Sequence, residues 1–410
     1  MSVEIPQREF DEAALGAAQR EVVETLAQLE RKPCSDGERE AAEWLAARLA
    51  AVEGVEVALE DEPSWGTFPP TATGLGLLGV AGATLVLLGR RALGGLFALA
   101  ALAGIVDEAH NGPRIVRRLV RRRKRTVNVV ARTGDLQAQS TLVVLAHHDA
   151  PQTGLLFDQT LQRRLHERAP AVLARFKTPF PQWWAGLAGP LSTLLAASAG
   201  RRRLARAGLT LGTIGTLLVA DIWRSETVPG ANDNLSGVAA LVGLAELLRE
   251  RPVADLRVLL VSCGAEETLQ DGIRAFLASH RDELDLAHTA FINLDTVGSP
   301  HLLLLEAEGP VRMEHYTAPW LRELMALHAE RLGTPLRRGF RARASTDSVI
   351  PSRAGYPTAT LVSITDWLSP ANYHLPSDVP ANLDYDTVAA ATLLVHEVAG
   401  ALPAALAAAR

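Results

Sequence analysis

The sequence predicts an α/β fold in which helices sandwich a mostly parallel central sheet, with two apolar helical hairpins inserted into it. Along most of the 410 residues, β-branched and apolar runs of strand length alternate with segments of helical periodicity. This alternation is typical of a buried, parallel sheet covered by helices. Two further blocks are almost continuously apolar, and each is broken by a basic turn, which predicts the hairpins.

The elements of the sandwich follow from the spacing of their apolar residues. Leu45 and Leu49 belong to an apolar stripe at helical spacing, and Ser35 before that stripe predicts a capped helix start. The expected helices are 11–31, 37–52, 235–248, 272–278, 317–332 and 386–408. The expected strands are 55–59, 126–131, 141–146, 257–262, 291–294, 301–305 and 359–364. The sandwich is therefore assigned to residues 1–66, 111–180 and 225–410, and the hairpins to 67–110 and 181–224.

The bulk composition excludes several kinds of site. The chain carries 41 basic and 46 acidic residues, and its net charge of −5 gives no indication of a nucleic-acid partner. The two cysteines, Cys34 and Cys263, are too few for a disulfide framework and form no CxxC pair. Any metal site in this chain must therefore depend on imidazole and carboxylate ligands.

Each apolar block is predicted to form a pair of helices around arginines. The four pieces are 71–89, 92–106, 183–200 and 207–222. A membrane-spanning helix usually needs about 20 apolar residues, with about 17 as a lower limit, and the pieces lie at or just below it. Trp183, Trp184 and Trp223 at the outer ends favour membrane insertion, because indole rings collect at the lipid–water interface. We therefore expect the hairpins to contact membrane lipid; the alternative is a helical pair that mediates a homodimer of a soluble enzyme.

The distribution of basic residues predicts the orientation of the chain. The N-terminal segment has no early apolar core with a cleavage site, so no signal peptide is expected. The basic run 114–125 lies on the α/β side of the first hairpin, and basic residues close to a membrane mark its cytoplasmic face. We expect a multi-pass protein of a bacterial inner membrane with its α/β part in the cytoplasm, although the hairpin tips are basic too.

Acidic and imidazole residues follow several predicted strands directly, where an open α/β sheet places its ligands. His147 and Asp149 follow strand 141–146, Glu266 and Glu267 follow strand 257–262, and Asp295 follows strand 291–294. Asp233 precedes helix 235–248, and His374 lies in a loop after the last strand. Each residue alone has an ordinary structural explanation, such as a helix cap or a solvated face. Together they indicate a metal site at one edge of the sheet.

The number and type of these residues suit two metal ions. Two cations about 3.5–4 Å apart need a bridging carboxylate and further histidine and carboxylate ligands. The sequence supplies that set and one spare glutamate. Because neighbouring side chains at a strand end point to opposite sides, one residue of the pair Glu266-Glu267 can bind metal while the other faces substrate as a base.

On these residues the chain resembles the M28 zinc peptidases, the family of the bacterial and yeast aminopeptidases. The matching stretches are 146–149 (Ala-His-His-Asp), 230–237 (Gly-Ala-Asn-Asp-Asn-Leu-Ser-Gly), 265–267 (Ala-Glu-Glu), 293–295 (Asn-Leu-Asp) and 373–374 (Tyr-His), with 345–348 and 354–357 resembling two further family segments. The resemblance covers about residue 20 to the C-terminus, apart from the hairpins. It implies a zinc-exopeptidase-like fold and a membrane-anchored aminopeptidase that acts on peptides.

The resemblance also implies a role for each residue. It assigns one zinc to His147 and Asp295, the other zinc to Glu267 and His374, and the bridging position to Asp233. It implies that Glu266 is the general acid/base and that Asp149 orients His147. Asp378 after His374 is expected to orient the His374 imidazole.

The sequence departs from the family after the glutamate pair. Where the family usually has Gly-Leu-x-Gly, residues 268–272 are Thr-Leu-Gln-Asp-Gly, so the local turn and the substrate wall are expected to differ. Two other functions stay open: an M28-like amidohydrolase or one-zinc glutaminyl cyclase, and an inactive membrane scaffold. The complete ligand set favours two zincs over one, and the intact Glu266 argues against a scaffold.

Overall fold

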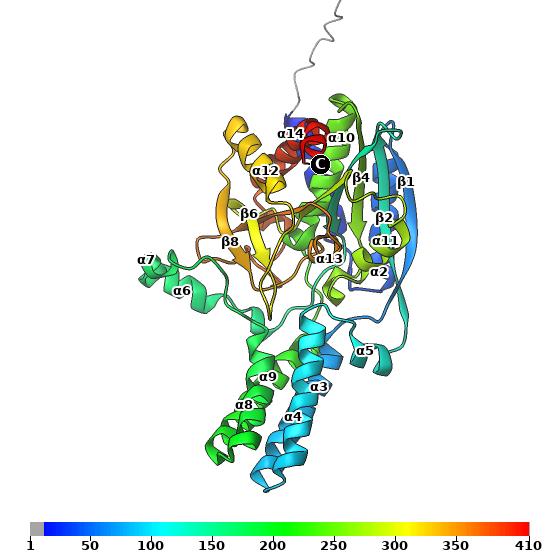
Figure 1. The fold of residues 1–410 in the computed structure, drawn as a ribbon. Coiled ribbons are helices and arrows are strands. Elements are labelled where there is room, and N and C mark those ends of the chain that lie inside the picture. The colour runs from blue at the N-terminus through cyan, green and yellow to red at the C-terminus, as the bar shows by residue number, and fades with distance from the viewer. Residues whose placement is uncertain (1–11, 410) are drawn as a thin grey trace, which may run out of the picture.

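A nine-stranded sheet forms the centre of the molecule, and a bundle of four helices projects from one end of it (Figure 1). The computed structural model describes residues 12–409. The strands are β1 (Glu56–Ser64), β2 (Lys124–Gly134), β3 (Ser140–His147), β4 (Leu256–Cys263), β5 (Thr289–Leu294), β6 (His301–Glu308), β7 (Glu314–His315), β8 (Arg337–Ala342) and β9 (Thr358–Ile364). Their order is β1-β2-β4-β3-β5-β9-β6-β7, and β8 pairs with β6.

The sheet is parallel at its centre and antiparallel towards its edges. Strands β4, β3, β5 and β9 pair in parallel, whereas β2 joins β4 and β6 joins β9 in antiparallel orientation. The carboxyl ends of the four central strands therefore share one edge, which is the arrangement that collects functional residues in α/β proteins. The predicted α/β class with a central sheet flanked by helices is confirmed.

Helices cover both faces of the sheet because its strands are apolar on both. Leu142 and Val144 of β3 join the larger core, while Val143 and Leu145 join the core on the opposite face. The larger core lies under α1 (Glu12–Leu26), α2 (Asp36–Ala50), α10 (Ser236–Glu250), α12 (Pro319–Leu332) and α14 (Tyr385–Ala408). The helix α11 (Asp271–His280) packs on the opposite core, beside α13 (Val349–Arg353).

The helices and strands predicted for the sandwich are present, with ends that differ by a few residues. The first predicted helix begins at residue 11, which lies outside the described residues, and α1 ends earlier than expected. At the start of α2 the Ser35 side chain accepts a hydrogen bond from the Glu38 backbone N–H, as predicted. The Glu38 carboxylate does not close the capping box; it accepts the N–H groups of Cys34 and Ala265 instead. Glu38 thereby ties α2 to the segment that carries Glu266.

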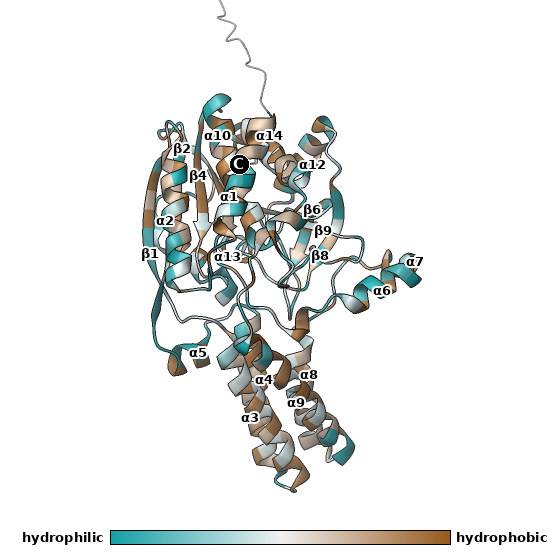
Figure 2. Cartoon of the chain, turned by 180° about the vertical axis from the view of Figure 1, so that it is seen from behind, coloured by the Kyte–Doolittle hydropathy of each residue, from teal (hydrophilic) through white to brown (hydrophobic). Residues whose placement is uncertain are grey.

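The two apolar blocks form antiparallel helical hairpins that pack together as a bundle. The first hairpin is α3 (Pro69–Leu87) and α4 (Arg91–Ala109), and the second is α8 (Trp184–Ala199) and α9 (Arg202–Arg224). Figure 2 shows hydrophobic residues along all four helices. At the hairpin tips, Arg91 donates hydrogen bonds to the carbonyl groups of Ala197 and Ser198, so the tip of one hairpin caps a helix of the other.

The bundle is built with small residues inside and large apolar residues outside. Leu77, Leu96 and Leu217 are 58%, 61% and 64% exposed, although they lie in the most apolar segments of the chain. Inside the bundle, a β-carbon on Gly189 would lie 2.3 Å from the Cα atom of Gly212, so glycine is required for that close approach. Small residues at the contacts and large apolar residues on the outer surface are typical of helices that pack within lipid.

Among the described residues, four helices are long and apolar enough to cross a membrane: α3, α4, α9 and α14. The last of these lies in the larger core of the sandwich, where it packs against α10 and the sheet, as its apolar character predicted. Helix α8 has 16 residues and a length of about 24 Å, and it lies against α9 throughout the second hairpin. The bundle is therefore the part of the molecule that is suited to a membrane.

Candidate metal centre

The predicted metal ligands meet at the carboxyl edge of the central strands. His147 ends β3, and Asp295 follows β5 directly. Glu267 lies in the short helix η3 (Glu266–Thr268) after β4, and Asp233 lies in η2 (Ala231–Leu235) before α10. His374 comes from the loop after β9. Five segments that are far apart in the sequence thus converge on one point because the parallel strands all end there.

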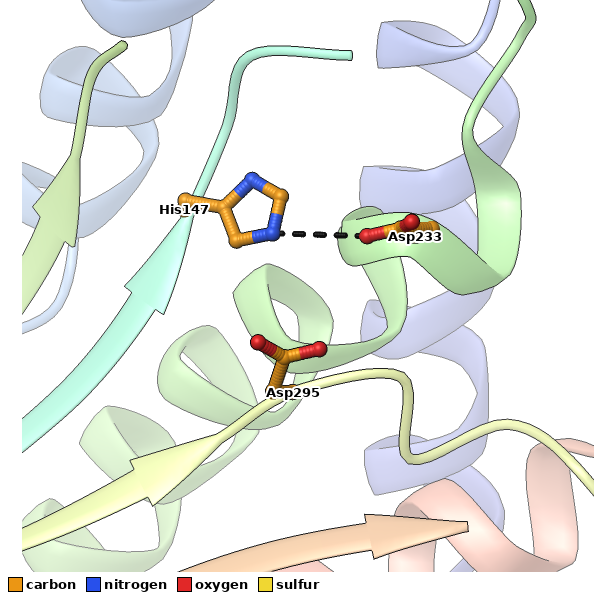
Figure 3. A group of neighbouring side chains, drawn as sticks. All are labelled: His147, Asp233 and Asp295. Carbon is orange, nitrogen blue, oxygen red and sulfur yellow. Dashed lines mark ion pairs between the residues drawn. The ribbon is translucent and has the colours of Figure 1, made fainter. Parts of the chain in front are cut away.

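These side chains form two overlapping clusters. The first cluster is His147, Asp233 and Asp295, and the second is Asp233, Glu267 and His374; within each, one ligand atom per residue lies within 4.8 Å of the others. His147 Nε2 is 3.4 Å from Asp233 Oδ1 (Figure 3). His374 Nε2 is 3.1 Å from Asp233 Oδ2 and 3.4 Å from Glu267 Oε1. Asp233 therefore offers one carboxylate oxygen to each cluster.

The geometry and charge of both clusters fit metal ions. Ligand atoms that lie about 2.0–2.2 Å from a zinc ion are roughly 3–4 Å from one another, which matches the spacing within the clusters. Neither ring nitrogen of the buried His374 has a hydrogen-bond partner. Burial raises the pKa of Glu267 above its usual value and raises the pKa of Asp295 to about 7, since the charged forms are costly there without a cation.

Asp233 differs from the other carboxylates of the site. Burial alone would raise its pKa, but the nearby His147 and His374 imidazoles lower the pKa below its usual value. The Asp378 carboxylate accepts the backbone N–H groups of Asn232 and Asp233 at 2.8 Å and 3.1 Å, which fixes the backbone at Asp233. Asp378 therefore contacts the segment of the shared carboxylate, whereas the resemblance led us to expect a contact with His374.

Asp149 contacts the residues at the ends of both β3 and β4. One of its oxygens accepts the Glu266 N–H and the other accepts the Glu267 N–H, each at 3.0 Å. The first oxygen also lies 3.4 Å from His147 Nδ1. Asp149 is fully buried, so these contacts hold the glutamate pair and the imidazole in a fixed relation.

Glu266 is the carboxylate that belongs to neither of the two clusters around Asp233. Its Oε2 lies 3.9 Å from His147 Nε2, and it can also form a third group with His147 and Glu267. Burial raises the pKa of Glu266 well above its usual value. A buried carboxylate with a raised pKa is suited to accept and return a proton near neutral pH.

Gln270 contacts Glu266 directly, although no motif in the sequence predicts a role for this residue. Its side-chain amide donates to Glu266 Oε1 and to the Ser345 carbonyl oxygen. Asn111, just after the first hairpin, donates to Gln270 Oε1 at 2.6 Å. Leu269 and Gln270 have φ angles of 72° and 64°, a left-handed conformation that costs non-glycine residues roughly 1–2 kcal/mol each. This turn is where the sequence departs from the glycine-containing family pattern.

Replacing Gln270 with Leu is expected to lower the rate of hydrolysis roughly 10–100-fold, as is usual for residues that orient a functional group from behind it. The Gln270 amide donates to the ionised carboxylate, so its loss should raise the pKa of Glu266. The acid limb of the pH–rate profile should then move to higher pH. Asn111→Ala leaves the contact between Gln270 and Glu266 in place but removes the donor behind Gln270, together with the acceptor of Arg114 and Arg274, and should give a smaller shift in the same direction. An unchanged pH profile in Gln270→Leu would contradict this role.

Arg31 is a second supporting residue of the site that no sequence motif predicts. Its guanidinium is fully buried and donates to the carbonyl groups of Leu26, His148 and Pro229. His148 and Pro229 lie next to the segments that carry His147 and Asp233. Burial lowers the pKa of Arg31 to about 10, so the group stays charged at neutral pH. Arg31 thus holds together three chain segments around the clusters.

Arg31→Met is expected to destabilise the protein by on the order of 3 kcal/mol, because it leaves several buried carbonyl groups without donors. The change should appear as a lower midpoint of thermal unfolding in detergent. Arg31→Lys should recover only part of the loss, since an ammonium group cannot reach three carbonyl groups in a planar fork. Equal midpoints for wild type and Arg31→Met would show that these hydrogen bonds contribute little.

A cavity of about 190 Å³ connects the metal-ligand clusters with the helical bundle. Its lining includes the six residues His147, Asp233, Glu266, Glu267, Asp295 and His374. It continues along apolar residues of the sheet on one side and along residues of α3, α4, α8 and α9 on the other. The candidate site therefore opens towards the bundle, whose second hairpin lies between His147 and Asp233 in the sequence.

Comparisons with known proteins agree with this arrangement. Residues 216–399 match the model of peptidase family M28, a span that contains four of the five predicted ligands. Similar solved structures include a leucine aminopeptidase precursor from Bacteroides thetaiotaomicron, with a TM-score of 0.55, 14% identity, and coverage of 97% of this chain and 99% of that chain. An aminopeptidase from Aneurinibacillus sp. strain AM-1 has a TM-score of 0.55, 13% identity, and coverage of 94% and 93%.

A glutaminyl cyclase of Bacteroides thetaiotaomicron is similar to the same degree, with a TM-score of 0.55, 15% identity, and coverage of 96% of this chain and 99% of that chain. No curated protein sequence matches the chain significantly. At these identities the solved structures show a common fold, and the family match comes from the sequence of residues 216–399. Residues 216–399 are therefore similar to peptidase family M28, and the chain as a whole shares its fold with these solved structures.

Proposed function

We propose that this protein is a two-zinc exopeptidase that removes N-terminal residues from peptides, with Glu266 as its general base. The observation that carries the proposal is the pair of overlapping clusters that share Asp233, with a buried carboxylate outside both of them. His147 and Asp295 would hold one ion, and Glu267 and His374 the other. The M28 family match supports a hydrolase of peptide bonds.

When bound, the paired ions would polarise the scissile carbonyl and lower the pKa of a water molecule towards neutrality. Glu266 takes a proton from the attacking water and passes it to the departing nitrogen. Gln270 keeps the Glu266 carboxylate oriented, and Asp149 fixes the backbone on both sides of it.

The proposal is tested by the metal content and activity of the detergent-purified protein. We expect about two zinc ions per chain and hydrolysis of aminoacyl-amide substrates. Removal of the metal with a chelator should abolish turnover, and added zinc should restore it; cobalt or manganese suits the same ligands. A chain that binds no metal at these residues would contradict the whole proposal.

Two other functions remain distinguishable by the same assay. A glutaminyl cyclase would release ammonia from a peptide with N-terminal glutamine and leave the peptide bonds intact, and one bound zinc would favour it. An inactive scaffold would bind metal without turnover of any substrate. The intact Glu266 and the second cluster argue for the exopeptidase.

We also propose that the two hairpins span a membrane. Helices α3 and α4 have 19 residues each and are about 28 Å long, close to the roughly 30 Å of a bilayer core. Beside the bundle, α5 (Ile115–Val120) exposes Ile115 and Leu119. On the other side, α6 (Thr160–Arg168) exposes Leu161, and Phe176 is exposed just after α7 (Pro170–Leu173) (Figure 1). Such exposed apolar groups at the base of the α/β part suit the surface layer of a membrane.

The orientation follows from the basic residues that are free to meet lipid headgroups. Arg114 and Arg117 of the basic run form buried ion pairs with Asp271 and Glu108. Arg118 and residues 122–125 are exposed, and Arg121 is partly buried. We propose that the α/β part faces the cytoplasm of a bacterial inner membrane. In a protease-protection assay on spheroplasts, we expect the C-terminus to be cleaved only after the inner membrane is lysed. Cleavage in intact spheroplasts would contradict this orientation.

A further inference from the structure

The apolar lining of the cavity at the metal-ligand clusters comes from two parts of the molecule, which we call its two arms. One arm runs along the sheet and is lined by Leu305, Phe340 and Val362. The other runs into the helical bundle, where its lining includes Gly76, Gly186 and Gly212. Residues of α3, α4, α8 and α9 line this part of the cavity, so the bundle arm is a space for a ligand inside the part of the molecule that is suited to a membrane. A scissile bond at the clusters would thus have apolar surroundings on both sides.

Outside the metal-ligand clusters and Glu266, the described part of the cavity lining carries only positive charge. Apart from the cluster residues and Glu266, Arg343 is the one charged side chain among the described residues that line the cavity. It is half-buried, and no described carboxylate lies within ion-pair distance of it. Arg343 is two residues from Ser345, whose carbonyl oxygen accepts the hydrogen bond from Gln270. A half-buried guanidinium without a partner among the described residues, in the same cavity as Glu266, is suited to bind a carboxylate of the substrate.

We propose that the substrates are short apolar peptides with a free C-terminal carboxylate, taken up from the membrane through the bundle arm. This inference rests on the exopeptidase function proposed above. The apolar side chains on the two sides of the scissile bond occupy the two arms, and the C-terminal carboxylate binds Arg343. Because Arg343 and Glu266 line the same cavity of about 190 Å³, a peptide that contacts both is short. Such peptides arise when a protease cuts an apolar, membrane-inserted segment, so a reaction of that class would supply the substrate.

The test compares four tripeptides with detergent-purified, zinc-loaded enzyme: Leu-Leu-Leu and Leu-Gly-Gly, each as free acid and as C-terminal amide. All four present the same N-terminal leucine. For wild type we expect kcat/KM for Leu-Leu-Leu acid to exceed that for Leu-Gly-Gly acid and for Leu-Leu-Leu amide by about tenfold or more, the usual effect of one good apolar or charge-assisted contact. Equal values for the four peptides would overturn the inference while leaving the exopeptidase function intact.

Two variants with matched controls assign the effects to the arms. A β-carbon on Gly186 would meet its nearest atom at 3.8 Å, so a side chain fits there and a leucine would fill the bundle arm. Gly186→Leu should abolish the preference for Leu-Leu-Leu over Leu-Gly-Gly. The control is Gly74→Leu on the exposed face of α3, where a β-carbon meets nothing within 4 Å. A preference that survives Gly186→Leu, or that Gly74→Leu removes equally, would overturn the role of the bundle arm.

Arg343→Gln should remove the preference for the free acid over the amide, mainly through KM. The exposed Arg341, which is not part of the cavity lining, provides the control Arg341→Gln, and its preference should match wild type. Binding of the same peptides to the zinc-loaded Glu266→Gln variant, measured by calorimetry, separates recognition from turnover. Tighter binding of Leu-Leu-Leu acid without turnover in wild type would support this inference and contradict the exopeptidase. Binding without preference would contradict the inference itself.

Discussion

Glu266→Gln is expected to lower the rate of peptide hydrolysis by about 10²–10⁴-fold while the bound metal stays in place. The glutamine has nearly the same shape but cannot take a proton from water. Glu266 lies outside both clusters that share Asp233, so the six ligand positions of those clusters are untouched. The measurement is kcat for a peptide substrate, together with the metal content of the same preparation.

A second buried glutamate provides the control for this variant. Glu308 is fully buried at the end of β6, and burial raises its pKa to about 8, so it is largely uncharged at neutral pH. Glu308→Gln should therefore retain nearly wild-type activity. If Glu266→Gln loses metal as well as activity, Glu266 is a ligand, as the third group with His147 and Glu267 would allow. If it keeps most of its activity, another residue is the base.

Asp233→Asn is expected to remove both metal ions and reduce turnover to background. Asp233 is the one residue that belongs to both clusters, and it presents a separate oxygen to each histidine. An amide has only one such oxygen and no charge, so neither ion keeps its set of ligands. The measurement is the metal content per chain by mass spectrometry, with circular dichroism to establish that the variant is folded.

Asp295→Asn is the matched variant, because Asp295 belongs to the first cluster alone. It should lower the content from about two ions to about one and leave the ion held by Glu267 and His374. If Asp233→Asn and Asp295→Asn lose the same amount of metal, Asp233 does not bridge. If Asp233→Asn retains both ions, the assignment of the ligands to two overlapping clusters is wrong.

The sandwich and the convergence of the five candidate ligands could be predicted because both depend on local sequence patterns. Each central strand is a short apolar run, and the ligand follows where the run ends, as His147 does after β3 and Asp295 after β5. The hairpins were predictable from length and composition for the same reason. Strand β8 and helix α5 were not, because the first is a charged edge strand and the second has only six residues. Neither element has a periodic apolar pattern long enough to recognise.

The supporting residues of the site could not be predicted because their roles depend on contacts between distant segments. Gln270 accepts a hydrogen bond from the Asn111 amide, which is 159 residues away in the sequence. Arg31 donates to the His148 carbonyl, which is 117 residues away. A buried arginine or a glutamine has many possible partners, and nothing in the local sequence selects among them. The departure from the family pattern at 268–272 predicted a different turn, but it did not predict that Gln270 in this turn would contact Glu266.

The contact from Asn111 through Gln270 to Glu266 has a consequence for attempts to obtain a soluble enzyme. Asn111 is held where α4 leaves the bundle, and nearby Arg114 is paired with Asp271 in the same turn as Gln270. Excision of residues 67–110 would leave this junction without its fixed end, and the Glu266 side chain would lose its orientation. The first hairpin is in this sense a piece of the active-site framework, and truncated forms that are well folded should still be poor catalysts.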